Sequence, residues 1–274
     1  MTTTPPPPLP ALGQTSFYFL GCGKMGSALL KAWIAAGASP QYITARTASP
    51  SSAEKLHATY GIHASDSAPY AGQDVVILAV KPQILPEALP AFAGEQRPLY
   101  ISLAAGKTLA YFNGILGAEA RVIRTMPNTP SQLGLGMTAL SAGENATQDD
   151  TYLTSHLFRA AGEILWMEES RIDAAAAIAG SGPAYLFHFA EALMANAKEL
   201  GFSEEEAKLL TAQTLSGSVA LAEAGNWDVA RLRQDVTSKA GVTEAALNIL
   251  MPALTPLLRE ALLANIARSK TLSA

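Results

Sequence analysis

Cysteine and charge are both scarce in this sequence. Cys22 is the one cysteine among 274 residues, which excludes a disulfide framework and fits a reducing compartment. Charged residues make up 15%, and the net charge of −4 provides no basic surface for nucleic acid. No uninterrupted apolar run is long enough to cross a bilayer, and the first residues lack the basic and apolar regions of a signal peptide. We therefore predict a soluble, cytoplasmic protein that binds neither nucleic acid nor membrane. No metal site is expected. A catalytic role for Cys22 would need a base nearby, and none of the histidines forms an evident constellation with it.

Hydrophobic residues are abundant, at 49%. With so few charges, the chain has either a large core or an apolar surface that an oligomer covers. Composition divides it into three parts. Residues 1–14 are proline-rich and are expected to form a disordered tail. Residues 15–170 are predicted to form one domain of alternating strands and helices, and residues 171–274 a second, helical domain.

Short apolar stretches alternate with helical stretches between residues 17 and 167. The stretch 74–80 is apolar after its first residue, which is typical of a strand covered on both faces. Predicted strands are 17–20, 42–45, 74–80, 99–103, 121–125 and 164–167, and predicted helices are 27–36, 51–60, 86–92, 109–116 and 148–161. This alternation predicts an α/β, Rossmann-like domain with a doubly wound, mostly parallel sheet.

Beyond residue 170, alanine, leucine and glutamate dominate. Predicted helices are 172–178, 184–200, 203–224, 229–235, 243–250 and 256–270. Leu186, Phe189, Leu193 and Leu200 recur at helical spacing, which is typical of packing between helices. Because helices this apolar exceed what one small domain buries, we predict an all-α dimerisation domain covered by a partner subunit.

A glycine loop links the first predicted strand to the first predicted helix, with the pattern Gly21-x-Gly23-x-x-Gly26. Gly21 allows a tight turn, Gly23 leaves room for a pyrophosphate, and Gly26 lets the helix pack closely on the strand. Free N–H groups at the helix start would face the phosphates. The loop also contains Cys22, Lys24 and Met25; Lys24 is either a phosphate contact or a solvated side chain, and Cys22 is interpreted as a small filler.

The end of the second predicted strand distinguishes NADP from NAD in such folds. An acidic residue there binds the ribose hydroxyls, whereas an arginine accepts the 2′-phosphate. This chain has Arg46 at that place and no carboxylate before Glu54, with Thr47 as a neighbouring hydroxyl donor. NADPH is therefore the expected cofactor, with NADH as the alternative.

Three further loops follow predicted strands and should meet at the carboxyl edge of the sheet, where ligands bind. One could let a nicotinamide ring lie against backbone at Ala105 and Gly106, and another holds Asn128 between two prolines. The residues interpreted as cofactor-binding in these loops are Ala79, Val80, Lys81, Pro82, Ala105, Gly106 and Asn128.

The segment 238–243, Ser-Lys-Ala-Gly-Val-Thr, leads into a predicted helix. Ser238 and Thr243 hydroxyls, together with free N–H groups at the helix start, could hold a carboxylate. The spacing alone equally suits an N-cap role for Thr243.

Taken together, these segments resemble the pyrroline-5-carboxylate reductase family over nearly the whole chain. The matching motifs are Phe-Leu-Gly-Cys-Gly-Lys-Met-Gly at 19–26, Asp-Val-Val-Ile-Leu-Ala-Val-Lys-Pro-Gln at 74–83, Met-Pro-Asn-Thr-Pro at 126–130 and Gly-Ser-Gly-Pro-Ala-Tyr at 180–185. Lys24 replaces a usual asparagine. The family's Ser-Pro-Gly-Gly-Thr-Thr signature is altered by Lys239, Ala240 and Val242, while Ser238, Gly241 and Thr243 are retained.

The resemblance implies hydride transfer from NADPH or NADH to the C=N carbon of 1-pyrroline-5-carboxylate, which gives L-proline. It places the substrate carboxylate on Ser238, Gly241, Val242 and Thr243, commonly of the neighbouring subunit, with Thr243 near the imine nitrogen as the catalytic residue. It also implies a homodimer through the helical domain, and further assembly of dimers.

Three other functions share part of this pattern. A β-hydroxyacid dehydrogenase has a catalytic lysine soon after a similar glycine pair, whereas the next lysine after Gly182 here is Lys198. A reductase of another cyclic imino acid would differ only in pocket shape. A non-catalytic pyridine-nucleotide-binding protein is favoured by the altered segment 238–243 and opposed by the retained Asn128, Ser238 and Thr243.

Overall fold

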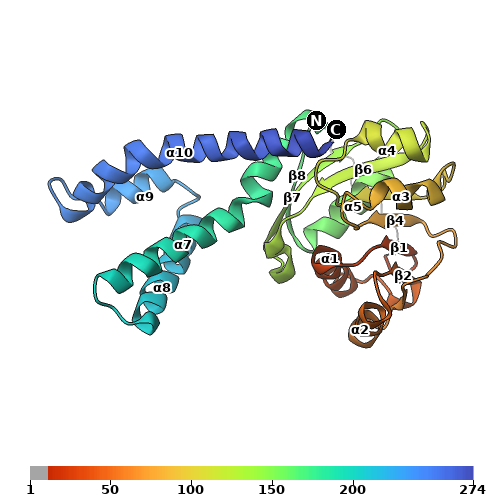
Figure 1. Ribbon diagram of the computed structural model, residues 1–274, viewed down its shortest axis with the longest axis horizontal. Helices are drawn as coiled ribbons and strands as arrows, with labels where there is room; N and C mark the ends of the chain where they lie inside the picture. The colour runs from red at the N-terminus through yellow and green to blue at the C-terminus, as the bar shows by residue number, and fades with distance from the viewer. Residues whose placement is uncertain (1–11, 274) are drawn as a thin grey trace, which may run out of the picture. The chain divides into compact units, whose positions relative to one another are not determined.

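The computed structural model describes residues 12–273, and the chain forms two compact units (Figure 1). The first unit contains the chain up to Ser181 and again from Ile266 onward, and the second contains Gly182–Asn265.

An eight-stranded sheet forms the centre of the first unit, in the order β3-β2-β1-β4-β5-β6-β7-β8. Neighbouring strands are parallel except β6 and β7, which are antiparallel. The doubly wound, mostly parallel sheet is thereby confirmed. The strands are β1 Phe17–Leu20, β2 Ile43–Arg46, β3 His63–Ser65, β4 Val75–Leu78, β5 Leu99–Ser102, β6 Arg121–Met126, β7 Gly136–Ala142 and β8 Gly162–Trp166.

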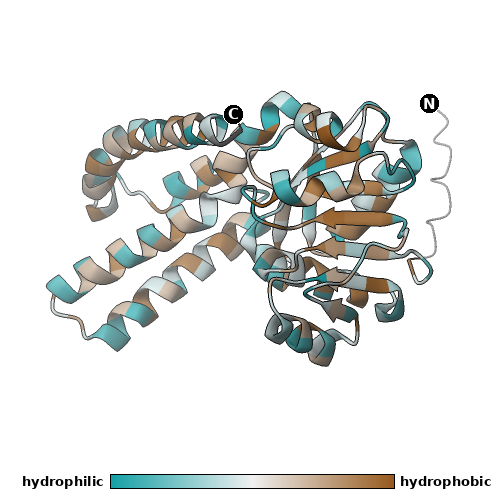
Figure 2. Ribbon diagram, turned by 45° about the vertical axis from the view of Figure 1, so that its right-hand side comes forward, coloured by the Kyte–Doolittle hydropathy of each residue, from teal (hydrophilic) through white to brown (hydrophobic). Residues whose placement is uncertain are grey.

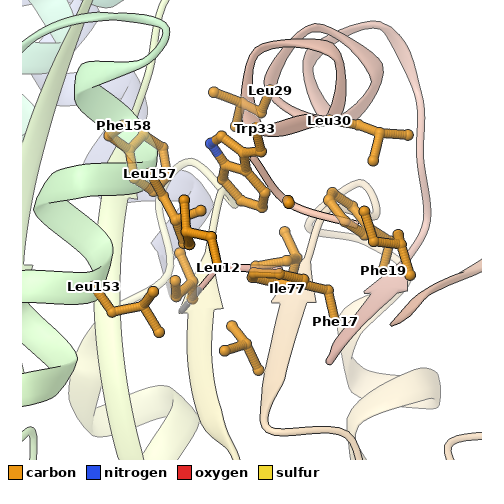
Figure 3. Packing of buried hydrophobic residues seen from close by; sticks show 14 of the residues in the cluster. Leu12, Phe17, Phe19, Leu29, Leu30, Trp33, Ile77, Leu153, Leu157 and Phe158 are labelled. Carbon is orange, nitrogen blue, oxygen red and sulfur yellow. The ribbon is translucent and has the colours of Figure 1, made fainter. Parts of the chain in front are cut away.

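The middle of the sheet is buried on both faces, since every residue of β1, β4 and β5 is buried and successive side chains of a strand point to opposite faces. Phe17 and Phe19 of β1 pack in one cluster with Trp33 and Phe158, as Figure 3 shows. Tyr18 and Leu20 belong to a second cluster, with Tyr100 and Phe112 among its members. The helices of this unit are α1 Lys24–Ala35, α2 Pro50–Tyr60, α3 Leu85–Ala88, α4 Leu109–Leu116, α5 Gln148–Arg159 and α6 Ile172–Ala175.

Two strands were absent from the sequence-based prediction. β3 has only three residues, His-Ala-Ser, at an edge of the sheet, so no apolar run marks it. β7 pairs antiparallel with β6 and parallel with β8, and a 3₁₀ turn over Thr129–Leu133 separates β6 from β7. Because no α-helix separates β6 from β7, the strand–helix alternation used for the prediction does not mark β7.

The second unit is helical, as predicted. Its helices are α7 Gly182–Glu199, α8 Glu204–Ala224, α9 Val229–Asp235 and α10 Val242–Ser273, and α10 continues into the first unit. The two helices expected at 243–250 and 256–270 are one, with Pro252 and Pro256 inside it. Pro252 and Pro256 are four residues apart and therefore lie on the same face of α10. The hydrogen bond that Pro256 cannot donate would have gone to the carbonyl of Pro252, so the missing hydrogen bonds are confined to that face while the rest of the helix continues.

The helices of the second unit expose many apolar side chains. Figure 2 shows by colour that hydrophobic residues recur along these helices. Within α10, residues 242–271 are long and apolar enough to cross a membrane by length and composition, and none of the most apolar window is buried. The sequence-based exclusion of a span considered only uninterrupted apolar runs, and Arg259 and Glu260 lie within this helix.

The boundaries of the units differ from the expected ones. Leu12 lies in the hydrophobic core although the tail was expected to extend to residue 14, while residues 1–11 lie outside the described part of the chain. The segment that includes α6 and the π-helical turn Ala176–Gly180 contacts β7 and belongs to the first unit, whereas a boundary at 170 was expected. Composition cannot detect such packing of a helical segment against the sheet.

Candidate active site

Gly21 lies directly after β1, where the ends of three strands meet. Its N–H donates to the carbonyl of Arg46, over 2.9 Å. Its φ is +82°, and a Cβ there would lie 2.7 Å from Cγ1 of Val80. Both the left-handed conformation and the close approach of Val80 therefore require glycine.

Gly23 and Gly26 have different environments. Gly23 is the N-cap of α1, has no side-chain cap, and has no atom within 4 Å of a Cβ built on it. The first N–H groups of α1 lack intrahelical partners, which makes this helix start suited to a phosphate. Gly26 is buried, and a Cβ there would touch Cys22 Sγ at 3.5 Å and Ala79 Cβ at 3.6 Å. The arrangement thus fits a pyrophosphate in front of Gly23 and close packing behind Gly26.

The remaining side chains of the loop do not supply reactive groups. Burial raises the pKa of the Cys22 thiol to about 11, and its contact with Ser27 only partly opposes that rise. The thiol is therefore protonated at neutral pH and is no nucleophile. Lys24 is exposed as the first residue of α1, and Met25 packs partly buried against the core.

Arg46 is exposed at the end of β2, as the sequence predicted. Its Nε donates to the main-chain oxygen of Asp66, over 3.3 Å. Its guanidinium also interacts with the Tyr18 hydroxyl, whose pKa is raised by burial and lowered in part by Arg46. Thr47 was expected as a hydroxyl donor, but it is buried and its Oγ1 donates to the oxygen of Ser49 at 2.9 Å. Arg46 is therefore the better candidate for a 2′-phosphate, and Thr47 shapes the loop.

The loop that follows β4 lies beside the glycine loop. The N–H of Ala79 donates to the oxygen of Leu20 over 2.9 Å, and Val80 touches the position of Gly21. Lys81 is exposed and Pro82 is half-buried. The structure thus brings Ala79 and Val80 together with Gly21 at the carboxyl edge of the sheet.

The loop that follows β5 is held by two hydroxyl groups. Ser102 Oγ accepts from the N–H of Ala104 at 3.2 Å, and Thr125 Oγ1 of β6 donates to the oxygen of Ser102 at 2.9 Å. Ala105 is exposed, and Gly106 turns the chain with a φ of +73°. Ser102 and Thr125 were missed by sequence analysis; hydroxyls at the ends of otherwise apolar strands were the available signal.

Asn128 does not present its whole amide to a ligand. Oδ1 accepts from the N–H of Met137 at 2.8 Å, and Nδ2 donates to the oxygen of Ala179 at 3.0 Å. The side chain thereby joins the end of β6 to the start of β7 and to the π-helical turn. A supporting role for the loop fits this geometry better than the direct cofactor contact that we expected.

The residues expected to bind the substrate gather at the start of α10, in the second unit. The N–H of Gly241 donates to the oxygen of Ser238 at 3.0 Å, and a Cβ on Gly241 would overlap Ser238 Oγ. Because α10 begins at Val242, Thr243 lies in the first turn and is not the N-cap. Val242 is 90% exposed. Ser238 and the first N–H groups of α10 thus provide donors suited to a carboxylate.

Ala240 adopts a φ of +59°, the left-handed conformation for which glycine is favoured. Its N–H donates to Oε2 of Glu244 at 2.7 Å, so the glutamate caps the loop from within the first turn of the helix. Across the described residues, no group of three metal-ligating side chains is found.

Comparison with known proteins adds independent evidence. The pyrroline-5-carboxylate reductase of Vibrio alginolyticus is 36% identical over 259 residues, which cover 92% of this chain and 95% of that protein. This chain belongs to the pyrroline-5-carboxylate reductase family. A family model for pyrroline-5-carboxylate reductase dimerisation matches residues 169–272, and one described as NADP oxidoreductase, coenzyme F420-dependent, matches residues 16–106.

Solved structures of the reductase family show the same fold. A pyrroline-5-carboxylate reductase from Coxiella burnetii aligns with a TM-score of 0.86 and 37% identity, covering 95% of this chain and 99% of that one. The Plasmodium falciparum pyrroline carboxylate reductase, solved with NADP bound, aligns with a TM-score of 0.83 and 26% identity over the same shares. The expected family, fold class and NAD(P)-dependent oxidoreductase character are confirmed, and the homodimer is supported by the dimerisation model.

Proposed function

We propose that this chain reduces 1-pyrroline-5-carboxylate to L-proline with NADPH, as a cytoplasmic homodimer that assembles further. The observation that carries the proposal is the similarity to reductases of this substrate over 92% of the chain. The uncapped start of α1 in front of Gly23 supports nucleotide binding independently, since nothing lies within 4 Å of the space that a Cβ would fill there.

When bound, NADPH supplies the hydride that reduces the C=N carbon. The N–H groups at the start of α1 would hold its pyrophosphate, and Arg46 would hold its 2′-phosphate. The backbone at Ala105 and Gly106 would accommodate the flat nicotinamide ring. These residues bind and orient; they take no part in proton transfer.

The chain's chemical work on the substrate is mostly positioning. The N–H groups and the Ser238 hydroxyl at the start of α10 would bind the carboxylate of the ring. The Thr243 hydroxyl would donate a hydrogen bond to the neutral imine nitrogen and relay to it, from water, the proton that product formation requires. Fixing the ring against the nicotinamide then supplies most of the acceleration.

The test follows NADPH absorbance with racemic pyrroline-5-carboxylate and identifies proline as the product. Thr243→Ala should lower kcat/KM by about 100-fold, which is typical for the loss of a group that assists proton transfer, while Thr243→Ser retains most activity. NADPH binding, followed by fluorescence, should stay unchanged in both variants. Cofactor binding without any turnover in the unmodified protein would favour the non-catalytic alternative.

A second candidate, a reductase of another cyclic imino acid, is favoured by the altered loop. Val242 lacks the hydroxyl usual at its position, and Ala240 holds a strained φ of +59°. The same assay with six-membered and sulfur-containing cyclic imino acids distinguishes the two, because the preferred substrate has the higher kcat/KM.

A further inference from the structure

Arg124 lies buried in β6, with its side chain only 4% exposed, and pairs with two carboxylates. Nη1 contacts Oε1 of Glu169 at 3.2 Å, and Nη2 contacts Oδ1 of Asp173 at 2.7 Å. Glu169 lies just before α6, and Asp173 lies within it. A buried guanidinium must have such partners, because an unpaired charge there would be costly.

The same carboxylates reach two other segments. Oδ1 of Asp173 also accepts from Oγ of Ser269, near the end of α10, at 3.2 Å. Oε1 of Glu169 also accepts from the N–H of Leu109, the first residue of α4, at 2.7 Å. One buried arginine therefore links α6, the end of α10 and the start of α4.

These contacts coincide with the two places where the chain passes between the units. It leaves the first unit after Ser181, shortly beyond Asp173, and returns at Ile266, shortly before Ser269. We propose that Arg124 is a positioning residue that clamps both connections, and thereby sets the affinity for the substrate whose carboxylate the second unit binds. The effect on substrate affinity rests on the proposed function, whereas the role of Arg124 in holding the two connections does not.

The test variant is Arg124→Met/Glu169→Gln/Asp173→Asn, which removes every charge of the network and leaves none unpaired. Hydrogen–deuterium exchange should become faster in 172–181 and 266–271. KM for pyrroline-5-carboxylate should rise about five- to tenfold, with kcat and the NADPH Kd changed less than about twofold. The single variant Arg124→Lys keeps the charge and both carboxylates, so hydrogen–deuterium exchange in the two segments should be slower than in the triple variant.

The matched control is Arg121→Met/Asp150→Asn, which removes another partly buried pair of the same unit, 2.7 Å apart, at the start of β6. It should leave exchange in the two connections and KM unchanged. If the triple variant does not fold, Asp173→Ala takes its place, because Arg124 then keeps Glu169 as its partner.

Unchanged exchange in both connections of a folded variant would overturn the clamp, and so would an equal rise of KM in the control. Faster exchange in a protein whose unmodified form does not reduce pyrroline-5-carboxylate would support the clamp and refute the proposed function.

Discussion

The side-chain amide of Asn128 donates a hydrogen bond to the main-chain oxygen of Ala179, over 3.0 Å. The two residues are 51 positions apart in the chain, and the asparagine is 7% exposed. Its oxygen accepts from the N–H of Met137 as well. One buried amide therefore fixes the loop after β6, the start of β7 and the π-helical turn relative to one another. A residue that only bound the cofactor would not need these two hydrogen bonds.

Asn128→Ala should lower the free energy of unfolding by about 1–3 kcal/mol, because the N–H of Met137 and the carbonyl of Ala179 lose their buried partner. Asn128→Asp keeps an acceptor but places a carboxylate against a carbonyl, so it should destabilise as much. Urea denaturation measures both. Asn145→Ala is the control, since the hydrogen bond from Asn145 to Ala118 is exposed, and a change within about 0.5 kcal/mol is expected. Full stability of Asn128→Ala with a large loss of NADPH affinity would instead identify a direct ligand.

Two glycines of the same loop should respond differently to alanine. Gly21→Ala places a Cβ 2.7 Å from Val80 at a φ of +82°, so the protein should lose stability. Gly23→Ala has no atom within 4 Å and an ordinary φ, so it should fold normally and lose NADPH affinity, because the methyl group occupies the space meant for the pyrophosphate. Thermal melting and fluorescence titration with NADPH separate the two effects. Normal NADPH binding by Gly23→Ala would refute the phosphate site.

Arg46→Gln tests the choice of cofactor. Loss of the guanidinium should raise KM for NADPH about tenfold or more, a loss typical of one charge-assisted contact of about 1.5–3 kcal/mol. KM for NADH should change little, because NADH carries no 2′-phosphate, so NADH kinetics of the same variant serve as the control. An equal effect on both cofactors would show that Arg46 supports the loop rather than recognising phosphate.

The sequence predicted correctly those helices and loops that neighbouring residues in the chain determine. The helix at 109–116 and the one at 229–235 have the predicted bounds, because Thr108 and Asp228 cap their starts and Gly117 ends the former. The glycine loop was found because a strand and a helix flank it directly. In the site, Gly21 and Arg46 lie where the βαβ pattern placed them.

The remaining features depend on partners distant in sequence. β7 becomes a strand by pairing with β6 and β8, and Leu12 is buried by residues that follow it by many positions. Asn128 has its role because it bonds to Ala179. Arg124 has its role because it pairs with Glu169 and Asp173. No rule of sequence spacing connects these partners. A buried arginine in the middle of an apolar strand was nonetheless a visible signal, since such a charge requires partners.

Asp74 should make stability depend on pH. Burial alone would raise the pKa of this carboxyl, but hydrogen bonds from the Ser16 hydroxyl and N–H and the charge of Arg97 lower it further than burial raises it. A carboxyl whose pKa is lowered by folding stabilises the protein above its unfolded pKa of about 3.9, and that contribution is lost as pH falls through the folded pKa.

Asp74→Asn should therefore destabilise the protein near neutral pH by about 0.5–1 kcal/mol, a modest value because the carboxylate is 45% exposed. The difference from the unmodified protein should shrink as the pH falls below about 4. Urea denaturation over a pH series measures it, with Glu144→Gln, an exposed loop residue, as the control. A difference that stays constant with pH would mean that the ionised carboxylate is not the stabilising form.

At Ala240 the residue type conflicts with the backbone conformation. Its φ of +59° places a Cβ in the left-handed region, which costs about 1 kcal/mol relative to glycine. Ala240→Gly should therefore raise the free energy of unfolding, although the greater freedom of glycine in the unfolded chain offsets part of the gain. Ala253→Gly, at an exposed site within α10, should lower it by about 1 kcal/mol. If both glycines destabilise alike in urea, the loop does not hold Ala240 in the strained conformation. If Ala240→Gly stabilises and also lowers KM for pyrroline-5-carboxylate, the strain disturbs the donors at the start of α10 that hold the carboxylate.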